Sequence, residues 1–291
     1  MMNIITFAQL TVHEARRRKV VAAGLLFGLA FLALYATSMV LINQQLSKTQ
    51  TEFIFPQITR GVAGSRQLGL SIVHELFTMA GLYAVNFLIV MMSVLMPIDT
   101  LSGEIASGAI QSLVVKPVRR ADVLLGKWLG FWLLSSSYLL LMCGGVLVTV
   151  WLVMGFSLEN VWQGLAIMLL ESTALLSISI AGGTRLTTLA NGVMCFGLFG
   201  LAFIGGWVEQ IGALTNIDAA KNVGVVTSLI VPSEAMWRLA AYYMQSPLMR
   251  EVTIGPFSSA SVPSNTMIGW TAGYIILLLL VAIRSFSRRD L

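Results

Sequence analysis

The stretch SGEIASGAIQSLVVKPVRRADVLLGKWLG, residues 102–130, stands between two long apolar runs. Each run is long enough to cross a bilayer, since a transmembrane helix needs about 20 predominantly apolar residues. The stretch itself holds a glutamate, a proline and two adjacent arginines, and charged residues are costly inside a bilayer. A hydrophobic chain therefore leaves the membrane here and then returns to it.

The composition of the whole chain supports this reading. Of its 291 residues, 57% are hydrophobic and only 11% are charged, whereas soluble domains have about 25% charged residues. The apolar runs are long and unbroken, which favours helices over the short alternating strands of a membrane barrel. The sequence therefore predicts an all-α integral membrane protein.

Six apolar runs predict six transmembrane helices. The first run holds 23 residues without a charge, which exceeds a signal-peptide core and predicts an uncleaved span, with cleavage after Ala33–Ala36 as the alternative. The predicted spans are about Val20–Ile42, Leu76–Met96, Trp128–Met154, Val161–Gly183, Ala190–Val208 and Met267–Ile283.

The positive residues predict the orientation. One side of the membrane carries twelve of the 18 Lys and Arg residues, and such an excess marks the cytoplasmic side. Both termini are therefore expected in the cytoplasm, and residues 209–266 are expected to form an extracytoplasmic loop within a single transmembrane domain, residues 1–291. The segments on the basic side are 1–19, 97–127, 184–189 and 284–291.

The extracytoplasmic loop contains a predicted helix. Pro232 and Ser233 are a plausible start, and Glu234 would lie in the first turn, where a carboxylate suits the helix dipole. The helix is expected to lie on the membrane surface, to pack as an outer loop helix, or to dip back into the protein. Its apolar face consists of Met236, Leu239, Ala240 and Tyr243.

The quoted stretch predicts a short amphipathic helix over Glu104–Val115, with Ala106, Ile110, Leu113 and Val114 on one face. Pro117 ends this helix because proline lacks a backbone donor and disfavours helical angles in the residue before it. Arg119 and Arg120 follow in the turn. Taken alone, these features equally suit an interfacial helix that only anchors two spans.

The order of residues in this stretch resembles the cytoplasmic loop between the second and third spans of ABC transporter permeases of the type-2, exporter-like family. The N-terminal segment Met2–Arg18 resembles the family's amphipathic elbow helix, and Ser285–Leu291 resembles its terminal basic motif. Arg119 departs from the pattern, since a small hydroxyl residue is usual there. The matching residues are Glu104, Gly108, Leu113, Pro117, Val118, Arg120, Leu125, Gly126 and Lys127.

The resemblance implies that Glu104–Val115 is a coupling helix that docks on a separate ATP-binding subunit. The chain has no G-x-x-x-x-G-K-[ST] motif, so ATP and Mg²⁺ would be bound by that subunit and no cofactor by this chain. A second permease copy or a paralogue, a prokaryotic plasma (inner) membrane and export are also implied, and nucleic acid is not. The implied coupling residues are Glu104, Gly108, Ile110, Leu113, Lys116, Pro117, Arg119 and Arg120.

Other functions remain as alternatives. A six-helix scaffold or channel would lack the ATPase partner. An intramembrane zinc protease is disfavoured because neither of the two histidines begins an H-E-x-x-H motif. Fifteen methionines suggest a permease that handles copper, since thioethers suit Cu(I). The membrane subunit of the nitrous-oxide-reductase maturation transporter is an architectural relative. Most of these methionines lie in apolar runs, however, where they are ordinary core residues.

Two polar residues at membrane depth are candidates for a substrate path. Glu171 lies near the middle of the fourth span, where a charge costs about 2.5–3.5 kcal/mol, and Asn86 lies near the middle of the second. The alternative for Glu171 is a hydrogen bond between helices, for instance with Asn86. In related exporters the first, second and fifth spans line the path, which favours Asn86. Cys143 and Cys195 lie in apolar runs and are predicted to be buried and unpaired.

Overall fold

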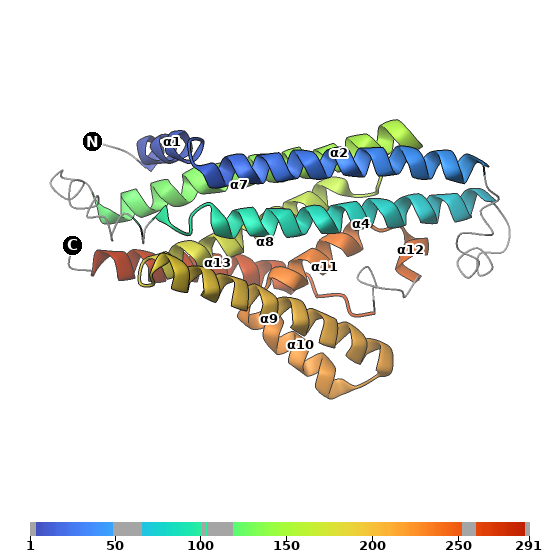
Figure 1. Ribbon diagram of the computed structural model, residues 1–291. Helices are drawn as coiled ribbons and strands as arrows, with labels where there is room; N and C mark the ends of the chain where they lie inside the picture. Colours follow the sequence, from blue (N-terminus) through green and yellow to red (C-terminus); the bar gives the residue numbers. More distant parts are fainter. Residues whose placement is uncertain (1–3, 49–65, 101–102, 104–118, 252–259, 289–291) are drawn as a thin grey trace.

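The computed structural model describes residues 4–48, 66–100, 103, 119–251 and 260–288, and this part of the chain is helical and contains no strand. Figure 1 shows the long helices lying side by side. The helices are α1 (Ile4–Ala15), α2 (Lys19–Lys48), α4 (Arg66–Leu95), α7 (Arg120–Met154), α8 (Val161–Gly183), α9 (Thr188–Thr215), α10 (Asp218–Ile230), α11 (Ser233–Met244), α12 (Pro247–Glu251) and α13 (Thr266–Ser287).

Six of these helices, α2, α4, α7, α8, α9 and α13, are long and apolar enough to cross a membrane. The prediction of an all-α membrane protein with six spans is therefore confirmed. The fourth predicted span has the bounds of α8, whereas α9 continues beyond its predicted end at Val208 to Thr215. The helix passes Glu209 because the charge of that residue is neutralised by Arg238 of α11.

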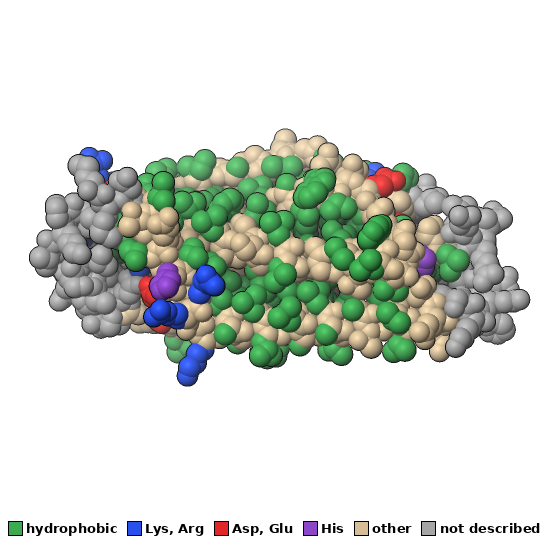
Figure 2. Space-filling view, turned by 90° about the horizontal axis from the view of Figure 1, so that it is seen from above, with side chains coloured by type: hydrophobic (Ala, Val, Ile, Leu, Met, Phe, Trp, Pro, Cys, Tyr) green, Lys and Arg blue, Asp and Glu red, His purple; other side chains and the backbone are tan. Residues whose placement is uncertain are grey.

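The two termini lie at the same end of the helical bundle (Figure 1), as an even number of spans requires. In Figure 2, hydrophobic side chains spread over the middle of the visible face, and Lys and Arg side chains gather towards one end. We call this the basic end; it carries the helix ends near Arg18, Arg120, Arg185 and Arg284.

Helix α8 forms the centre of the bundle. Most of α8 is buried within the protein, whereas most of α2 is exposed. Small and hydroxyl residues of α8 let neighbouring helices approach closely, and they accept hydrogen bonds from α7: the Trp128 indole donates to Ser177 Oγ at 3.0 Å and the Trp132 indole to Thr173 Oγ1 at 3.0 Å. Cys143 is buried and free in this core, as predicted.

Helices α10 and α11 form a hairpin towards the end opposite the basic end (Figure 1), and of the two only α11 is mostly buried in the bundle. Helix α10 packs along α9, and α11 packs on α8. Close approach of α10 and α9 depends on glycine: a methyl group at Gly205 would lie 1.9 Å from Thr227 Oγ1, and one at Gly224 would lie 2.2 Å from Glu209 Cβ. A larger residue at either position would push the two helices apart.

The segment predicted as an outer loop helix is therefore buried. Helix α11 begins at Ser233, next to Pro232, as predicted, and Met236, Leu239 and Ala240 of its predicted apolar face belong to the main hydrophobic core. Trp237, on another side of the helix, is also fully buried. Of the three positions left open by the sequence, the structure has the one in which the helix dips back into the protein.

The hairpin is fastened to α4 where it leaves the bundle. The Glu75 carboxylate accepts hydrogen bonds from the backbone N–H and the hydroxyl of Ser246, both at 2.6 Å. Ser246 precedes α12, so this carboxylate also lies at the N-terminus of that short helix, where negative charge is favourable. Glu75 thus serves a structural role between α4 and the end of the hairpin.

Helix α1 packs against the first half of α7. A methyl group at Gly126 would lie 2.3 Å from Phe7 Cβ, and one at Gly130 would lie 2.7 Å from Thr11 Cβ. The spacing of these two glycines therefore fits α1 onto one face of α7. The N-terminal helix predicted before the first span is present and is held by the third span.

Candidate functional site

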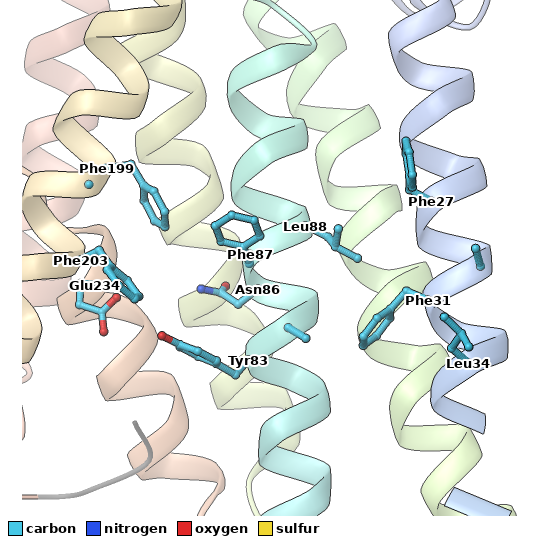
Figure 3. A pocket seen from close by; sticks show the side chains of 13 residues that line it. Phe27, Phe31, Leu34, Tyr83, Asn86, Phe87, Leu88, Phe199, Phe203 and Glu234 are labelled. Atoms are coloured by element: carbon cyan, nitrogen blue, oxygen red, sulfur yellow. The ribbon is translucent and has the colours of Figure 1, made fainter. Parts of the chain in front are cut away.

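A cavity of about 640 Å³ lies at about mid-height of the bundle, between α2, α4, α9 and α11 (Figure 3). Its volume falls within the roughly 300–1,000 Å³ of sites for small organic ligands. Its walls are Phe27, Ala30, Phe31 and Leu34 of α2; Tyr83, Ala84, Asn86, Phe87 and Leu88 of α4; Phe199, Gly200 and Phe203 of α9; and Glu234 of α11.

Aromatic rings form much of this wall. The rings of Phe87 and Phe199 join α4 to α9 with centroids 6.2 Å apart, and Phe203 follows Phe199 at 6.3 Å. Across the cavity, Phe31 stacks on Tyr35 with centroids 6.0 Å apart. Such spacings are typical of favourable aromatic pairs, so the cavity has a well-packed aromatic lining.

Three polar side chains share one side of the cavity. Figure 3 shows the Tyr83 hydroxyl, the Asn86 amide and the Glu234 carboxylate on the side away from α2, while Phe27, Phe31 and Leu34 lie across from them. These groups come from α4 and α11. The cavity is therefore apolar with one polar wall.

Both residues that the sequence predicted for a substrate path lie here, in different positions. Asn86 lines the cavity, whereas Glu171 is buried behind it on α8 and is 1% exposed. The Asn86 amide donates a hydrogen bond to Glu171 Oε1 at 3.2 Å. The interhelical hydrogen bond expected as the alternative for Glu171 is therefore present, and it also orients Asn86 at the cavity wall.

Glu234 was not predicted as a site residue. Its place in the first turn of α11 offers a local explanation, favourable interaction with the helix dipole, and this explanation hid its position. In the structure it is 8% exposed and faces the cavity, because Gly206 of α9 leaves room for its side chain: a methyl group at Gly206 would lie 2.3 Å from Glu234 Cγ. The feature of the sequence that could have indicated a site residue here is a carboxylate within an otherwise apolar helical segment.

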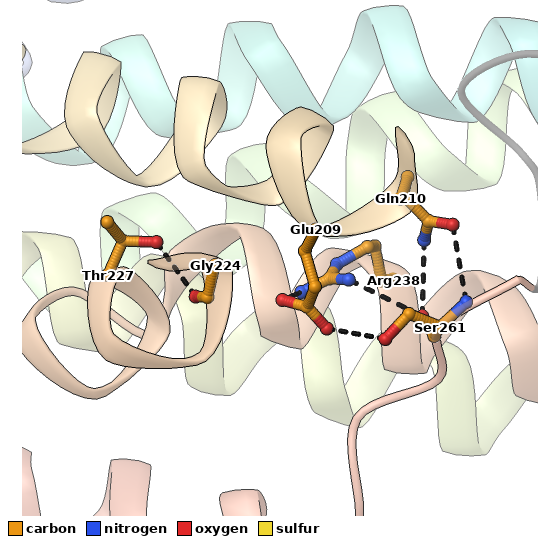
Figure 4. Close-up of polar contacts among 6 residues, drawn as sticks. All are labelled: Glu209, Gln210, Gly224, Thr227, Arg238 and Ser261. Carbon is orange, nitrogen blue, oxygen red and sulfur yellow. Dashed lines mark hydrogen bonds and ion pairs between the residues drawn. The ribbon is translucent and has the colours of Figure 1, made fainter. Parts of the chain in front are cut away.

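A buried ion pair lies one turn further along α11 (Figure 4). Arg238 Nη2 is 2.7 Å from Glu209 Oε2, and both side chains are almost completely buried, with exposed fractions of 5% and 6%. The Ser261 hydroxyl donates to Glu209 Oε1 at 2.5 Å, and Gln210 Nε2 donates to the Ser261 carbonyl at 3.1 Å. The network joins α9, α11 and the segment that leads into α13.

A second candidate site lies at the basic end, around the segment between α4 and α7. Glu104, Gly108, Ile110, Leu113, Lys116 and Pro117 lie outside the described residues, as does the predicted helix Glu104–Val115. Arg119 is exposed and has an extended backbone just before α7. The geometry of this site is therefore given by the residues that flank it.

These flanking residues are hydrogen-bonded to three other helices or helix connections. Thr188 at the start of α9 donates to Asp99 Oδ1 at 2.8 Å, and Arg18, between α1 and α2, donates to Thr100 Oγ1 at 3.2 Å. On the other side of the segment, Arg120 donates to the Ser287 carbonyl of α13 at 3.3 Å. We call these bonds the basal frame, because they join both ends of the segment to α2, α9 and α13.

A family model described as "ABC-2 family transporter protein" matches residues 12–291. A comparison with curated proteins gave no match. The matched range includes all six membrane-spanning helices, the α10–α11 hairpin and the segment between α4 and α7. The chain therefore belongs to the ABC-2 family of transporter permeases.

Proposed function

We propose that the chain is the membrane subunit of an ATP-driven exporter, and that a separate ATPase subunit binds its segment 104–115. Two permease copies, or this chain and a paralogue, would form the transport path between them. The basal frame is the observation that carries this proposal, since a segment that receives force must be joined firmly to the helices that move.

The basal frame supports such a connection. A force on residues 104–118 would act on α9 through the bond between Asp99 and Thr188 and on α13 through Arg120. Arg18 connects the same region to the corner between α1 and α2. Because helices are stiff over these lengths, a displacement of the segment would act on several spans together, which is what coupling to an ATPase requires.

The exposed side of α2 and α9 supports a second permease copy. Phe27 and Leu34 of α2 border the cavity and are 68% and 70% exposed. A methyl group at Gly197 or Gly200 of α9 would meet no described atom within 4 Å. Small residues let helices approach closely in lipid, so this face could accept the same face of a partner across the cavity.

The charge distribution supports an orientation with the basic end in the cytoplasm of a prokaryotic cell. Twelve of the 18 Lys and Arg residues belong to segments on that side, and positive residues are retained on the cytoplasmic side of the inner membrane. The ATPase, which would bind ATP and Mg²⁺, would therefore meet the segment 104–115 in the cytoplasm. Export then means movement towards the end opposite the basic end.

The test is purification of the tagged chain from its native membrane in mild detergent, with mass spectrometry of the proteins that accompany it. We expect a soluble subunit with a Walker A sequence in the purified complex. Ile110→Asp or Leu113→Asp, on the apolar face of the predicted helix, should remove it, whereas Gln111→Asp, on another face, should not. Absence of an ATPase from a folded preparation would instead favour a membrane scaffold or channel.

A further inference from the structure

We propose that the cavity between α2, α4, α9 and α11 binds a hydrophobic organic cation, with Glu234 as its counter-ion. The inference rests on the proposed function, because it assigns the substrate class to the cavity on the proposed path. It begins from the charges buried around this cavity.

Three carboxyl groups are buried in this part of the protein, on Glu171, Glu209 and Glu234. Arg238 forms an ion pair with Glu209, with Nη2 and Oε2 2.7 Å apart. Glu171 Oε1 accepts a hydrogen bond from the Asn86 amide. Arg238 also attracts the Glu234 carboxylate from the next turn of α11, so this one guanidinium serves two carboxyl groups. Among the described residues of this region, three buried carboxyl groups therefore share one arginine. Because buried charges are normally paired, the Glu234 carboxylate at the cavity can accept a further positive charge.

The position of Glu234 directs its charge into the cavity. The side chain is more than nine-tenths buried, yet it lines the cavity, and Figure 3 shows the carboxylate on the same side as Tyr83 and Asn86. Glu234 acts electrostatically on Glu171, which lies behind Asn86, and Glu209 acts on Glu234. Acidic groups therefore outnumber basic groups on this side of the cavity, and a ligand with a positive charge would compensate the charge of Glu234.

The remainder of the wall selects the kind of cation. Aromatic rings from α2, α4 and α9 surround the space, and an aromatic face attracts a cation within about 6 Å of the ring centroid. Ca²⁺ or Mg²⁺ would need about six or more oxygen ligands, which an aromatic wall cannot provide. An anion would be repelled by the Glu234 carboxylate. A cation with apolar substituents satisfies both the carboxylate and the rings, and the volume of about 640 Å³ accommodates an organic ligand of that size.

The test uses two ions of nearly the same shape and opposite charge, tetraphenylphosphonium and tetraphenylborate. Binding of each is measured by isothermal titration calorimetry on the purified transporter, permease with its ATPase, in detergent without nucleotide. We expect tetraphenylphosphonium to bind at least about tenfold more tightly than tetraphenylborate, because close charge pairs at buried sites contribute this much or more.

Glu234→Gln should weaken binding of tetraphenylphosphonium by at least about tenfold and leave binding of tetraphenylborate unchanged or stronger. Glu159→Gln, at an exposed glutamate between α7 and α8, should change neither. Phe87→Leu retains an apolar side chain of similar size and should weaken the cation alone, which separates attraction by the ring from simple hydrophobic burial. Each variant is used only if it elutes as a single folded species with its partner subunit.

Equal affinity of the wild-type protein for the two ions, or equal loss of both ions in Glu234→Gln, would overturn the inference. The proposed function fails by a different result, absence of an ATPase from the purified permease. If an ATPase is present but the cavity binds both ions equally, only the proposed substrate class is refuted.

Discussion

Replacing Arg238 by methionine should strongly destabilise the bundle, because it leaves the Glu209 carboxylate buried without its positive partner. Methionine retains an apolar stem of similar length, so the change removes mainly the charge and its hydrogen bonds. Removing one member of a buried ion pair costs about 3–5 kcal/mol. The Ser261 hydroxyl still donates to Glu209, which places the expected loss near the lower limit, about 3 kcal/mol.

A double-mutant cycle isolates the electrostatic part of this loss. Glu209→Gln combined with Arg238→Met removes both charges while a glutamine oxygen can still accept from Ser261, so stability should return to within about 1–2 kcal/mol of the wild type. The free energy of unfolding would be measured by denaturant titration in mild-detergent micelles. Lys221→Met is the matched control: it breaks an exposed ion pair with Asp218 and should cost no more than about 1 kcal/mol. A single variant as stable as wild type, or a double variant no better than the single, would refute the reasoning.

Two further predictions concern the basic end. Gly130→Ala should lower stability by about 1–3 kcal/mol, because the added methyl group would meet Thr11 of α1. Gly144→Ala on the same helix should be neutral, since its methyl group would meet no described atom within 4 Å. The two variants are compared by their apparent melting temperatures in detergent. Glu104→Lys should leave membrane insertion and ATP hydrolysis intact but lower transport, which is measured as substrate uptake into inverted vesicles. If transport by this variant stays coupled to ATP hydrolysis as in the wild type, the predicted coupling helix has no special role.

The spans were predictable because each is a continuous apolar run, and a run of that length has few alternatives in a membrane. The hydrogen bond between Asn86 and Glu171 was predictable for a related reason, since two polar groups at similar depth in neighbouring spans tend to find one another. In both cases the prediction depends only on where each residue lies along its own apolar run, which can be read directly from the sequence.

The α10–α11 hairpin falls within the predicted extracytoplasmic loop, residues 209–266, because its charges interrupt the apolar runs. Glu209 and Arg238 neutralise each other inside the bundle. Because the whole of α10 separates them in the sequence, no local pattern predicts that they form a pair. Glu234 was missed for the opposite reason, because its first-turn position already had a sufficient local explanation. Only the approach of α11 to Gly206 gives this residue its place at the cavity.

The two candidate sites lie on the same helices, and their separation suggests how one acts on the other. Phe199 lies about 16 Å along α9 from Thr188, at about 1.5 Å per residue, and Phe87 is on α4, whose basal end continues to Asp99. The bond between Thr188 and Asp99 ties these two walls together at the basic end. On the proposed function, helices tied at that end would separate further along their length, where Phe87 and Phe199 join α4 to α9. A displacement of residues 104–118 would then open the cavity away from the basic end, which is the direction that export requires.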